Sequence, residues 1–369
     1  MAEVKVLSSI AEVGEGRWNG LFPEQAEGYG YLLATELAGL SGFSWRYAVL
    51  EEGGKLLAAA PGFITEYQLE TTLSGLGQAA GKILRRWLPG LVTLRLGCLG
   101  SPCTETALVG FDSTLSADQR RDALSTLLKG FEEQMLDQQC ALIAVKDVPE
   151  GSPFPWRDVL ADAGYARALG LPIAFRSIDF ETVDSYLATL SAGTRKDMRR
   201  KLKMRAHVRI EPRKNIDDVI DQIMDLYAST LQRADMTFEE LTPEFFTGIL
   251  NYSSNSFFVL YIVDQKVVAA NLLIDTNKLL LDKFFVMSDH IARNHNLYFL
   301  SWFYNIEYCL SNKIGRFQAG QAAYANKVRL GCELIGTYLY FRHRNPIMNS
   351  VLKLIAHIFM ADPIPEAKA

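Results

Sequence analysis

The sequence predicts an α/β (α+β) protein of two similar halves, each a mixed, mostly antiparallel sheet flanked by helices. Its length of 369 residues exceeds what a single hydrophobic core usually serves. Hydrophobic residues make up 49% and charged residues 22%, a balance typical of chains that bury large cores. Two series of predicted elements also follow the same order, one series in each half.

The second half has the clearest elements. Three β-rich runs, separated by short polar turns, predict an antiparallel meander over 257–263, 267–274 and 279–287. Apolar residues at helical spacing predict one helix before the meander, over 217–231, and one after it, over 297–310. We expect strands at 316–319 and 337–342 to close this half.

The first half repeats this order less clearly. A hairpin is expected around the Glu-Glu-Gly-Gly turn at 51–54, and the later elements are a helix over 117–138, an apolar strand over 140–145, a helix over 156–163 and a strand at 175–180. The Gly- and Pro-containing stretch 164–172 marks the boundary. We therefore expect domains at 1–168 and 169–345, followed by an amphipathic helix and a disordered tail over 346–369.

The net charge and the spacing of the cysteines and histidines exclude several kinds of site and partner. The formal net charge of −4 gives no global attraction to polyanions, which argues against nucleic acid as a partner. The five cysteines lie singly, without CxxC, and the histidines lack HxxxH spacing, so no metal site and no disulfide framework are expected. No secretory signal or run of about 18 apolar residues is found, which predicts a cytoplasmic protein.

Two segments carry a family resemblance: LSAGTRKDMRRKLK at 190–203 and FQAGQAAYANKVRLG at 317–331. Over about 190–344 the chain resembles the FemAB-like acyltransferases, which pair two GNAT-like halves. In the first half only LLAAAPGF (56–63) and GSPCTE (100–105) are similar, and Gln318 stands where the family often has an acidic residue. The resemblance implies transfer of acyl or aminoacyl groups to amines, often on cell-envelope precursors, with acyl-CoA as cosubstrate and no permanently bound cofactor.

Seven cations crowd the eleven residues from 195 to 205. Arg195, Arg199 and Arg200 are candidates to bind the phosphates of a donor, a phosphorylated acceptor or lipid headgroups. Like charges four residues apart on a helix repel each other, which favours a ligand that neutralises them. The alternative is a solvated helix face.

The segment after the predicted strand at 316–319 carries further candidates. Gly320 allows the backbone to approach a ligand, so Gln318 and Gly320 are expected to contact the donor. Tyr324 and Lys327 lie three residues apart on one helical face, where a phenol can protonate a departing thiolate and an ammonium can hold a phosphate or carboxylate. The alternative is a strand-ending glycine followed by a surface helix.

Polar residues within apolar strands suggest catalytic roles. Asn271, Asp282 and Lys283 interrupt β-runs, which is costly unless each side chain is paired or faces a cleft. Alternation on a solvated sheet face is the ordinary alternative. Glu105 is a candidate general base, because amine attack needs a neutral nucleophile, and its alternative is an exposed loop acid.

The predicted function is N-acyl transfer from an acyl-CoA thioester to a primary amine of an amphipathic acceptor, with a long-chain or sphingoid-type amine as the preferred acceptor. Direct attack is expected, because no Ser/His/Asp or Cys/His arrangement is evident. Two alternatives stay open. One is an aminoacyl-tRNA-dependent Fem-type transferase acting on an envelope precursor, and the other is a non-catalytic binding protein with the same fold.

The C-terminal helix predicted over 346–360 is amphipathic. Ile347, Val351 and further apolar residues line one side, while Arg342, Arg344 and Lys353 lie beside it. This pattern predicts peripheral contact with an anionic membrane, at the inner face of the cytoplasmic membrane, and packing on the second domain is the alternative. A similar basic-apolar stretch lies at 82–91.

Overall fold

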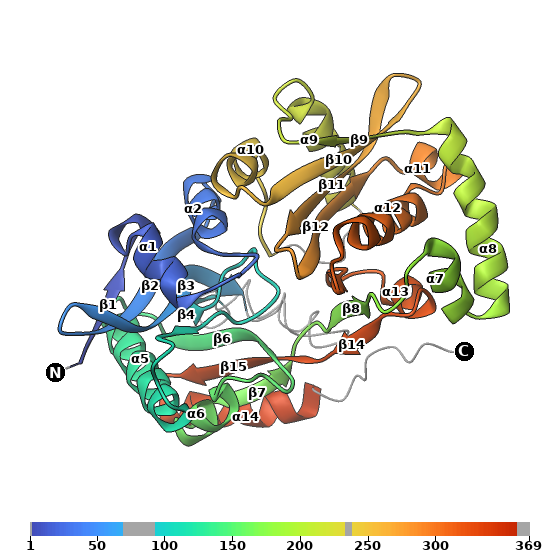
Figure 1. Cartoon of the computed structure of the whole chain (residues 1–369). Helices are drawn as coiled ribbons and strands as arrows, with labels where there is room; N and C mark the ends of the chain where they lie inside the picture. The colour runs from blue at the N-terminus through green and yellow to red at the C-terminus, as the bar shows by residue number, and fades with distance from the viewer. Residues whose placement is uncertain (1, 69–92, 233–237, 360–369) are drawn as a thin grey trace. The chain divides into compact units, whose positions relative to one another are not determined.

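The computed structural model describes residues 2–68, 93–232 and 238–359 as two mixed sheets flanked by helices (Figure 1). The predicted fold class is confirmed. The chain divides into two compact units, neither of which is continuous in sequence. Of the described residues, the first comprises those within 2–23, 40–171 and 336–359, and the second comprises those within 24–39 and 172–335.

The first unit holds the sheet with strand order β1-β2-β3-β4-β6-β15-β7, and β5 pairs with β3 beside this path. Its strands are β1 (Glu3–Leu7), β2 (Phe43–Glu52), β3 (Lys55–Gln68), β4 (Thr93–Leu99), β5 (Gly110–Phe111), β6 (Leu142–Pro149), β7 (Ala166–Leu169) and β15 (Thr337–His343). Its helices are η1 (Ile10–Glu12), α1 (Glu15–Leu21), α5 (Ala117–Asp137), α6 (Trp156–Asp162) and α14 (Pro346–Phe359).

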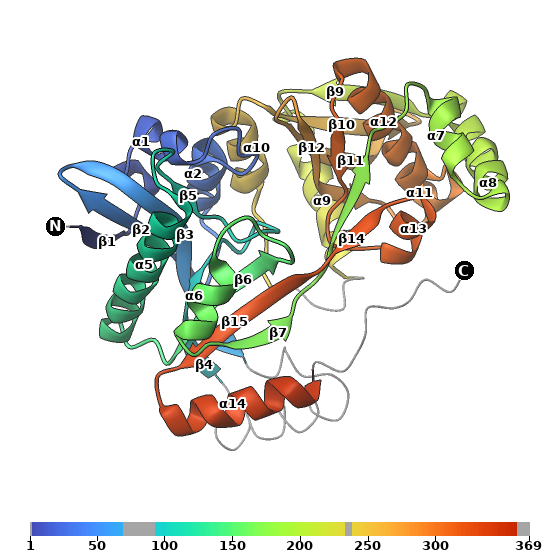
Figure 2. The ribbon, with the colours of Figure 1, turned by 60° about the horizontal axis from the view of Figure 1, so that its bottom comes forward.

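Two hydrophobic clusters hold this unit together. The helix α5 begins at a capping box formed by Ser116 and Gln119, and it buries Leu127 and Phe131 in the larger cluster. The helix α14 lies beside β7 and β15 and contacts both (Figure 2). Its Leu352 packs against a smaller cluster that includes Phe63. Part of α14 therefore packs on the first unit, whereas the alternative suggested by the sequence was packing on the second domain.

The second unit holds the sheet with strand order β14-β8-β13-β12-β11-β10-β9. Its strands are β8 (Ile173–Ser177), β9 (Arg209–Arg213), β10 (Ser256–Val263), β11 (Lys266–Asp275), β12 (Leu279–Met287), β13 (Arg316–Gln318) and β14 (Glu333–Ile335). Its helices are α2 (Tyr29–Leu37), α7 (Val183–Thr189), α8 (Ala192–Leu202), η3 (Lys203–His207), α9 (Ile220–Leu231), α10 (Pro243–Tyr252), α11 (His290–Asn294), α12 (Leu297–Asn312) and α13 (Tyr324–Arg329).

The meander β10-β11-β12 is antiparallel, as predicted, and helix α12 packs on one of its faces. The N-terminal helix α2 packs against α10, where the ring of Tyr31 lies 6.2 Å from that of Phe245. Contact is close, because a Cβ atom added at Gly30 would lie 1.9 Å from the carbonyl oxygen of Tyr252. Glycine at this position lets the two helices approach.

Two predicted strands each pair in the other sheet from the one that the sequence suggests. The strand expected at 175–180 in the first half is β8, which pairs with β13 and β14 of the second sheet. The strand expected at 337–342 to close the second half is β15, which pairs with β6 and β7 of the first sheet. Those two assignments are wrong, because local patterns show that a strand forms but not which sheet edge accepts it.

The compact units also divide differently from the continuous halves expected at 1–168 and 169–345. The main change of unit falls between Leu171 and Pro172, within the boundary stretch that the sequence suggests. Segment 24–39 belongs to the second unit, and residues 336–359 belong to the first. No helix in the described residues is long and apolar enough to cross a membrane.

Candidate functional site

The second sheet opens between β12 and β13. These two strands run parallel and pair over only three positions, the last joining Leu281 to Gln318. Strand β12 continues to Met287, whereas β13 ends at Gln318, and no other described strand pairs with that edge of β12. A sheet edge without a neighbouring strand is a place where a ligand that carries amide groups of its own can add to the sheet.

A β-bulge lies directly at this opening. The pairing of β12 with β11 jumps from Asp282–Leu273 to Phe284–Leu272, which leaves Lys283 as the extra residue. A bulge bends the strand and redirects backbone groups and side chains. Asp282 and Lys283 accordingly bond to different parts of the unit, Asp282 to α12 and Lys283 to the N-terminal segment.

A buried polar cluster surrounds Asp282 under helix α12. The Asn305 amide nitrogen donates a hydrogen bond of 2.9 Å to an Asp282 carboxylate oxygen. Asn271 is completely buried on β11, between Val259 and Phe285, which both belong to the core under α12. Two predicted catalytic residues, Asp282 and Asn271, thus lie on the same face of the sheet.

Several polar atoms of this cluster lack hydrogen bonds. Among the described residues, no partner reaches the hydroxyls of Tyr261 and Tyr298, either polar side-chain atom of Asn271, or the amide oxygen of Asn305. Leaving a buried polar group unpaired costs about 1–3 kcal/mol. Five such atoms together indicate that water or polar ligand atoms complete the cluster.

The two tyrosines remain hydrogen-bond donors at neutral pH. Burial, with a further contribution from the Asp282 carboxylate, raises the pKa of Tyr261 and of Tyr298 well above the usual value of a phenol. Each hydroxyl therefore keeps its proton. The cluster combines one carboxylate, amide groups and phenol donors within a buried part of the unit, a composition that can bind and deprotonate an amine.

The segment after β13 holds three further candidates. Gly320 has a φ of +78°, in the left-handed region that favours glycine. Tyr324 and Lys327 both lie on α13, where the Tyr324 hydroxyl donates to the Pro172 carbonyl at 2.9 Å and the Lys327 side chain is buried. The surface-helix alternative therefore does not describe Lys327.

Gln318 and Asp282 lie on neighbouring strands but on opposite faces. Phe317 packs 5.0 Å from Trp302 of α12, so the next residue, Gln318, points away from α12. Asp282 bonds to α12. The structure thus brings these two candidates to one opening of the sheet, although their side chains do not meet on one face.

The basic helix α8 is tied to α13 through Asp197. This carboxylate accepts hydrogen bonds from Arg200 at 2.8 Å and from Arg329 of α13 at 2.9 Å, and Lys201 lies at 3.2 Å. The hydrogen bond from Arg200, together with Lys201 and Arg329, lowers the pKa of Asp197 to about 2 against the opposing effect of burial. Three cations therefore share one anion.

Other protein groups contact some of the remaining cations of this segment. Arg195 donates to the Ala188 carbonyl at 3.2 Å, and Arg199 lies 3.7 Å from Asp184. The Lys201 ammonium also lies 3.3 Å from the ring centroid of Phe299. The side chains of Arg199 and Arg200 remain 59% and 76% exposed, so these two can still meet an anionic ligand.

Glu105 belongs to the first unit, whereas the other candidates belong to the second. It lies in the connection between β4 and β5 and is 8% exposed, so the alternative of an exposed loop acid is wrong. The ammonium of Lys146 supports this loop by donating to the carbonyls of Ser101 at 3.0 Å and Thr104 at 2.7 Å.

Sequence reasoning missed three members of the polar cluster: Tyr261, Tyr298 and Asn305. A usable signal existed for Asn305, since it is an amide at a buried position of an otherwise aromatic and aliphatic helix. A buried amide needs a partner, so its position predicts a polar group on the facing strand. The tyrosines carried no such signal, because tyrosine is common in ordinary cores.

Two mixed sheets in one chain, the second opening between parallel strands, define the fold class as a tandem GNAT-type protein. FemX is similar over 95% of this chain and 100% of its own, with 11% identity and a TM-score of 0.58. The C-terminal domain (DUF2156) of a putative lysylphosphatidylglycerol synthetase from Agrobacterium fabrum covers 97% of this chain and 99% of its own, at 14% identity and a TM-score of 0.56. A tandem GNAT protein from the clavulanic acid biosynthesis pathway is similar over 94% of this chain and 99% of its own, at 13% identity and a TM-score of 0.55.

The model of the FemAB-like family, described as peptidoglycan biosynthesis/recognition, matches residues 9–357, and the chain belongs to this family. The resemblance found in the sequence is thereby confirmed. Putative 8-amino-7-oxononanoate synthase 2 proteins of two Mycobacterium tuberculosis strains are 24% identical over 352 residues. That match covers 92% of this chain but 45% of the relatives, so the chain spans less than half of their length.

Proposed function

We propose that the chain is an N-acyltransferase that moves an acyl group from a coenzyme A thioester to a primary amine of an amphipathic acceptor. Family membership and the tandem GNAT fold support an acyl or aminoacyl transferase in general. The observation that carries the finer assignment is the opening between β12 and β13 with Asp282 and its incompletely bonded polar cluster beside it.

The donor fits the opening of the sheet. The pantetheine arm of coenzyme A contains amide groups, which can bond to the exposed edge of β12 in the manner of an added strand. Its phosphates need cations, and Arg199 and Arg200 of α8 keep exposed guanidinium groups. The tie from Asp197 to Arg329 holds α8 beside α13, the helix that follows β13.

The reaction proceeds by direct attack of the amine on the thioester carbonyl. In this step the neutral amine attacks, the C–N bond forms and the C–S bond breaks. Asp282 accepts the proton that the nitrogen loses, and a donor such as Tyr324 or Lys327 protonates the leaving thiolate. A cysteine nucleophile is disfavoured in this unit. Burial raises the pKa of the Cys309 and Cys332 thiols to about 12, so neither thiol ionises at neutral pH.

Two observations support an acceptor with an alkyl chain. The name of the mycobacterial relatives denotes synthesis of a nonanoate that carries an amine beside a ketone. A primary amine on an alkyl chain is also the acceptor that we propose for this protein. Ile347 and Leu354 of α14 also expose 75% and 64% of their surface, which suits a protein that meets an alkyl-bearing acceptor at a membrane surface. A long-chain or sphingoid-type amine combines both features.

The second candidate function is aminoacyl transfer from tRNA to an envelope precursor. The family description, peptidoglycan biosynthesis/recognition, favours it. The formal net charge of −4 and the pairing of Arg205 with Glu307 weigh against it, because a large RNA footprint needs many cations that are free to meet phosphates.

The test is a donor and acceptor panel with purified full-length chain. Acyl-CoAs of several chain lengths are combined with soluble and long-chain primary amines, and release of free thiol and formation of the amide are measured. Thiol release that requires an amine, and falls at least tenfold in Asp282→Asn but not in the exposed-turn variant Asp264→Asn, is the expected result.

Other results of this panel separate the alternatives. Transfer from aminoacyl-tRNA with no transfer from any acyl-CoA would establish the second candidate instead. Absence of turnover with every donor, together with no binding of coenzyme A, would leave a binding protein that kept the fold and lost the chemistry.

A further inference from the structure

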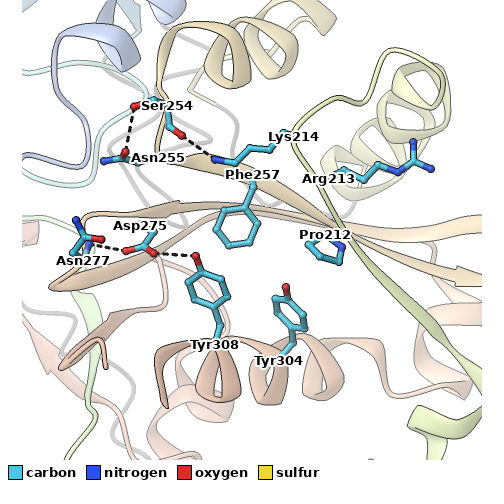
Figure 3. A pocket seen from close by; sticks show the side chains of 10 residues that line it. All are labelled: Pro212, Arg213, Lys214, Ser254, Asn255, Phe257, Asp275, Asn277, Tyr304 and Tyr308. Carbon is cyan, nitrogen blue, oxygen red and sulfur yellow. Dashed lines mark hydrogen bonds between the residues drawn. The ribbon is translucent and has the colours of Figure 1, made fainter. Parts of the chain in front are cut away.

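A cavity of about 410 Å³ lies at one end of the second sheet, between the end of β9, the end of β11 and the C-terminal half of α12 (Figure 3). Its volume falls within the range of roughly 300–1,000 Å³ that small-molecule sites occupy. The cavity is separate from the polar cluster. Phe257, which lines the cavity, and Asp282 lie on either side of Leu273, a fully buried residue that pairs with both.

Aromatic side chains form the walls of this cavity. Figure 3 shows Phe257, Tyr304 and Tyr308 pointing into it. The rings of Phe257 and Tyr308 lie 5.0 Å apart at 34°, and those of Tyr304 and Tyr308 lie 6.4 Å apart at 27°. The faces of such rings carry negative electrostatic potential, which attracts an organic cation.

Asp275 adds a carboxylate to these walls. It accepts hydrogen bonds from the Tyr308 hydroxyl at 2.9 Å and from the Asn277 backbone N–H at 2.6 Å, and both donors are neutral. Burial and this hydrogen bond raise the pKa of Tyr308, so the phenol keeps its proton beside the carboxylate. Within the described residues, no lysine or arginine forms an ion pair with Asp275.

Two cations, Arg213 and Lys214, are among the lining residues, and both are engaged by protein groups. The Lys214 ammonium also lies 5.9 Å from the ring centroid of Phe257. Arg213 donates to both carboxylate oxygens of Asp218 at 2.9 Å and to Glu211 at 2.5 Å, and Figure 3 shows its guanidinium pointing away from the rings. The Lys214 ammonium donates to the carbonyls of Ser254 and Ser256 at 2.8 and 3.0 Å. Glu211 also lies 3.7 Å from Arg209, so the charges paired around Arg213 balance one another. Asp275 is thus the lining carboxylate that an organic cation can approach.

We propose that this cavity binds an organic ammonium group, either a primary amine or a methylated amine on a short alkyl chain. The three rings surround the cation, and Asp275 supplies the opposing charge. This is a binding site apart from the proposed transfer centre, and it does not depend on the transfer reaction.

The test uses choline as the probe and its uncharged carbon isostere, 3,3-dimethylbutan-1-ol, as the comparison ligand. Each is titrated into the full chain, and the proton resonance of the probe methyl groups is followed, because ring currents shift a methyl group that lies among aromatic rings. We expect saturable choline binding with an upfield shift, at least about fivefold tighter than binding of the alcohol.

Two variants and two matched controls locate the binding. Asp275→Asn keeps an acceptor for Tyr308 while removing the charge, and Tyr304→Leu removes one ring, so each is expected to weaken choline binding about fivefold. Asp264→Asn, in an exposed turn, and Tyr252→Leu, at the 49% exposed end of α10, are expected to leave binding unchanged.

Equal binding of choline and the alcohol would overturn the proposal, as would choline binding that Asp275→Asn leaves unchanged. Displacement of choline by millimolar inorganic phosphate with direct phosphate binding at Lys214 would also overturn it, since the cavity would then be an anion site. Should Tyr304→Leu fail to fold, the isosteric Asp275→Asn variant decides the question alone.

Discussion

The ammonium of Lys283 and the carboxylate of Glu27 form an ion pair, with 2.5 Å between Nζ and Oε1 and side chains only 2% and 4% exposed. Lys283 is the bulged residue of β12, and Glu27 lies just before α2. The ammonium also lies 5.5 Å from the ring of Tyr31 and 5.7 Å from that of Phe284. This pair fixes the segment 24–39 to the second unit, although most of the first unit lies between them in sequence.

Removing one partner of this pair should destabilise the protein strongly. Glu27→Gln leaves the Lys283 charge buried without its anion, and a loss of about 3–5 kcal/mol in the free energy of unfolding is expected in urea denaturation. The double variant Glu27→Leu with Lys283→Met should recover much of that loss, because no charge is then buried. Glu24→Gln, which breaks the exposed pair with Lys278, should cost less than about 1 kcal/mol. A similar loss of stability in Glu27→Gln and Glu24→Gln would contradict the strong contribution that we expect from the buried pair.

Side chains on α13 should contribute to turnover. Lys327→Ala and Tyr324→Phe are each expected to lower the turnover number at least tenfold, about 1.4 kcal/mol of transition-state stabilisation, without unfolding the chain. The steady-state rate of thiol release measures this, with circular dichroism as the check on folding. Wild-type rates in both variants would remove these residues from the proposed site.

The stability contribution of Asp197 should depend on pH. Its pKa is lowered to about 2 from 3.8, so its ion pairs stabilise the folded state fully above about pH 4 and lose that effect as pH falls towards 2. Asp197→Asn should therefore cost on the order of 1–2 kcal/mol at pH 6, after allowance for partial solvent screening, and clearly less at pH 3. Urea denaturation at the two pH values measures the difference. A cost that does not change with pH would show that Asp197 acts through packing alone.

Neutralising the basic helix should weaken an electrostatic interaction with the donor. Replacing Arg195, Arg199 and Arg200 by glutamine is expected to reduce coenzyme A affinity more at low salt than at high salt, because charge attraction is screened over about 10 Å at 0.1 M. Calorimetric titration at two salt concentrations measures the effect. Lys201 and Arg329 still hold Asp197 in this variant, so the helix should stay in place. An unchanged salt dependence would return α8 to the interpretation as a solvated helix face.

Docking on a membrane should depend on the exposed apolar side of α14. Ile347, Val351 and Leu354 expose 75%, 43% and 64% of their surface, whereas Leu352 packs on the first unit. Ile347→Ser with Leu354→Ser should reduce binding to anionic vesicles and activity on membrane-borne acceptor, and spare activity on a soluble amine. Truncation after Asn345 should reduce binding as well, but it also uncovers the core near Leu352.

Vesicle co-sedimentation at several salt and anionic lipid contents measures this docking. Unchanged binding in the serine variant would refute the role of α14. The similar stretch at 82–91 lies outside the described residues, and its proposed membrane contact stays a prediction.

Local pattern alone determined most elements of this protein. The strand 279–287 and the meander around it follow from β-rich runs between polar turns, and α12 follows from apolar residues at helical spacing, because both patterns depend on neighbours in sequence. The family could also be recognised, since the segments 190–203 and 317–331 are continuous motifs.

Only the tertiary structure decided which elements share a sheet and which side chains share a site. Strands β8 and β15 exchange sheets because edge pairing depends on the hydrogen-bonding edge that each sheet leaves open, and no local pattern reports it. Asp282 could be predicted as a polar residue in an apolar strand. The residues that surround it could not, because Asn305, Tyr261 and Asn271 lie on three other elements, α12, β10 and β11. Burial of a polar group is costly only in relation to what surrounds it, and that is a property of the folded chain.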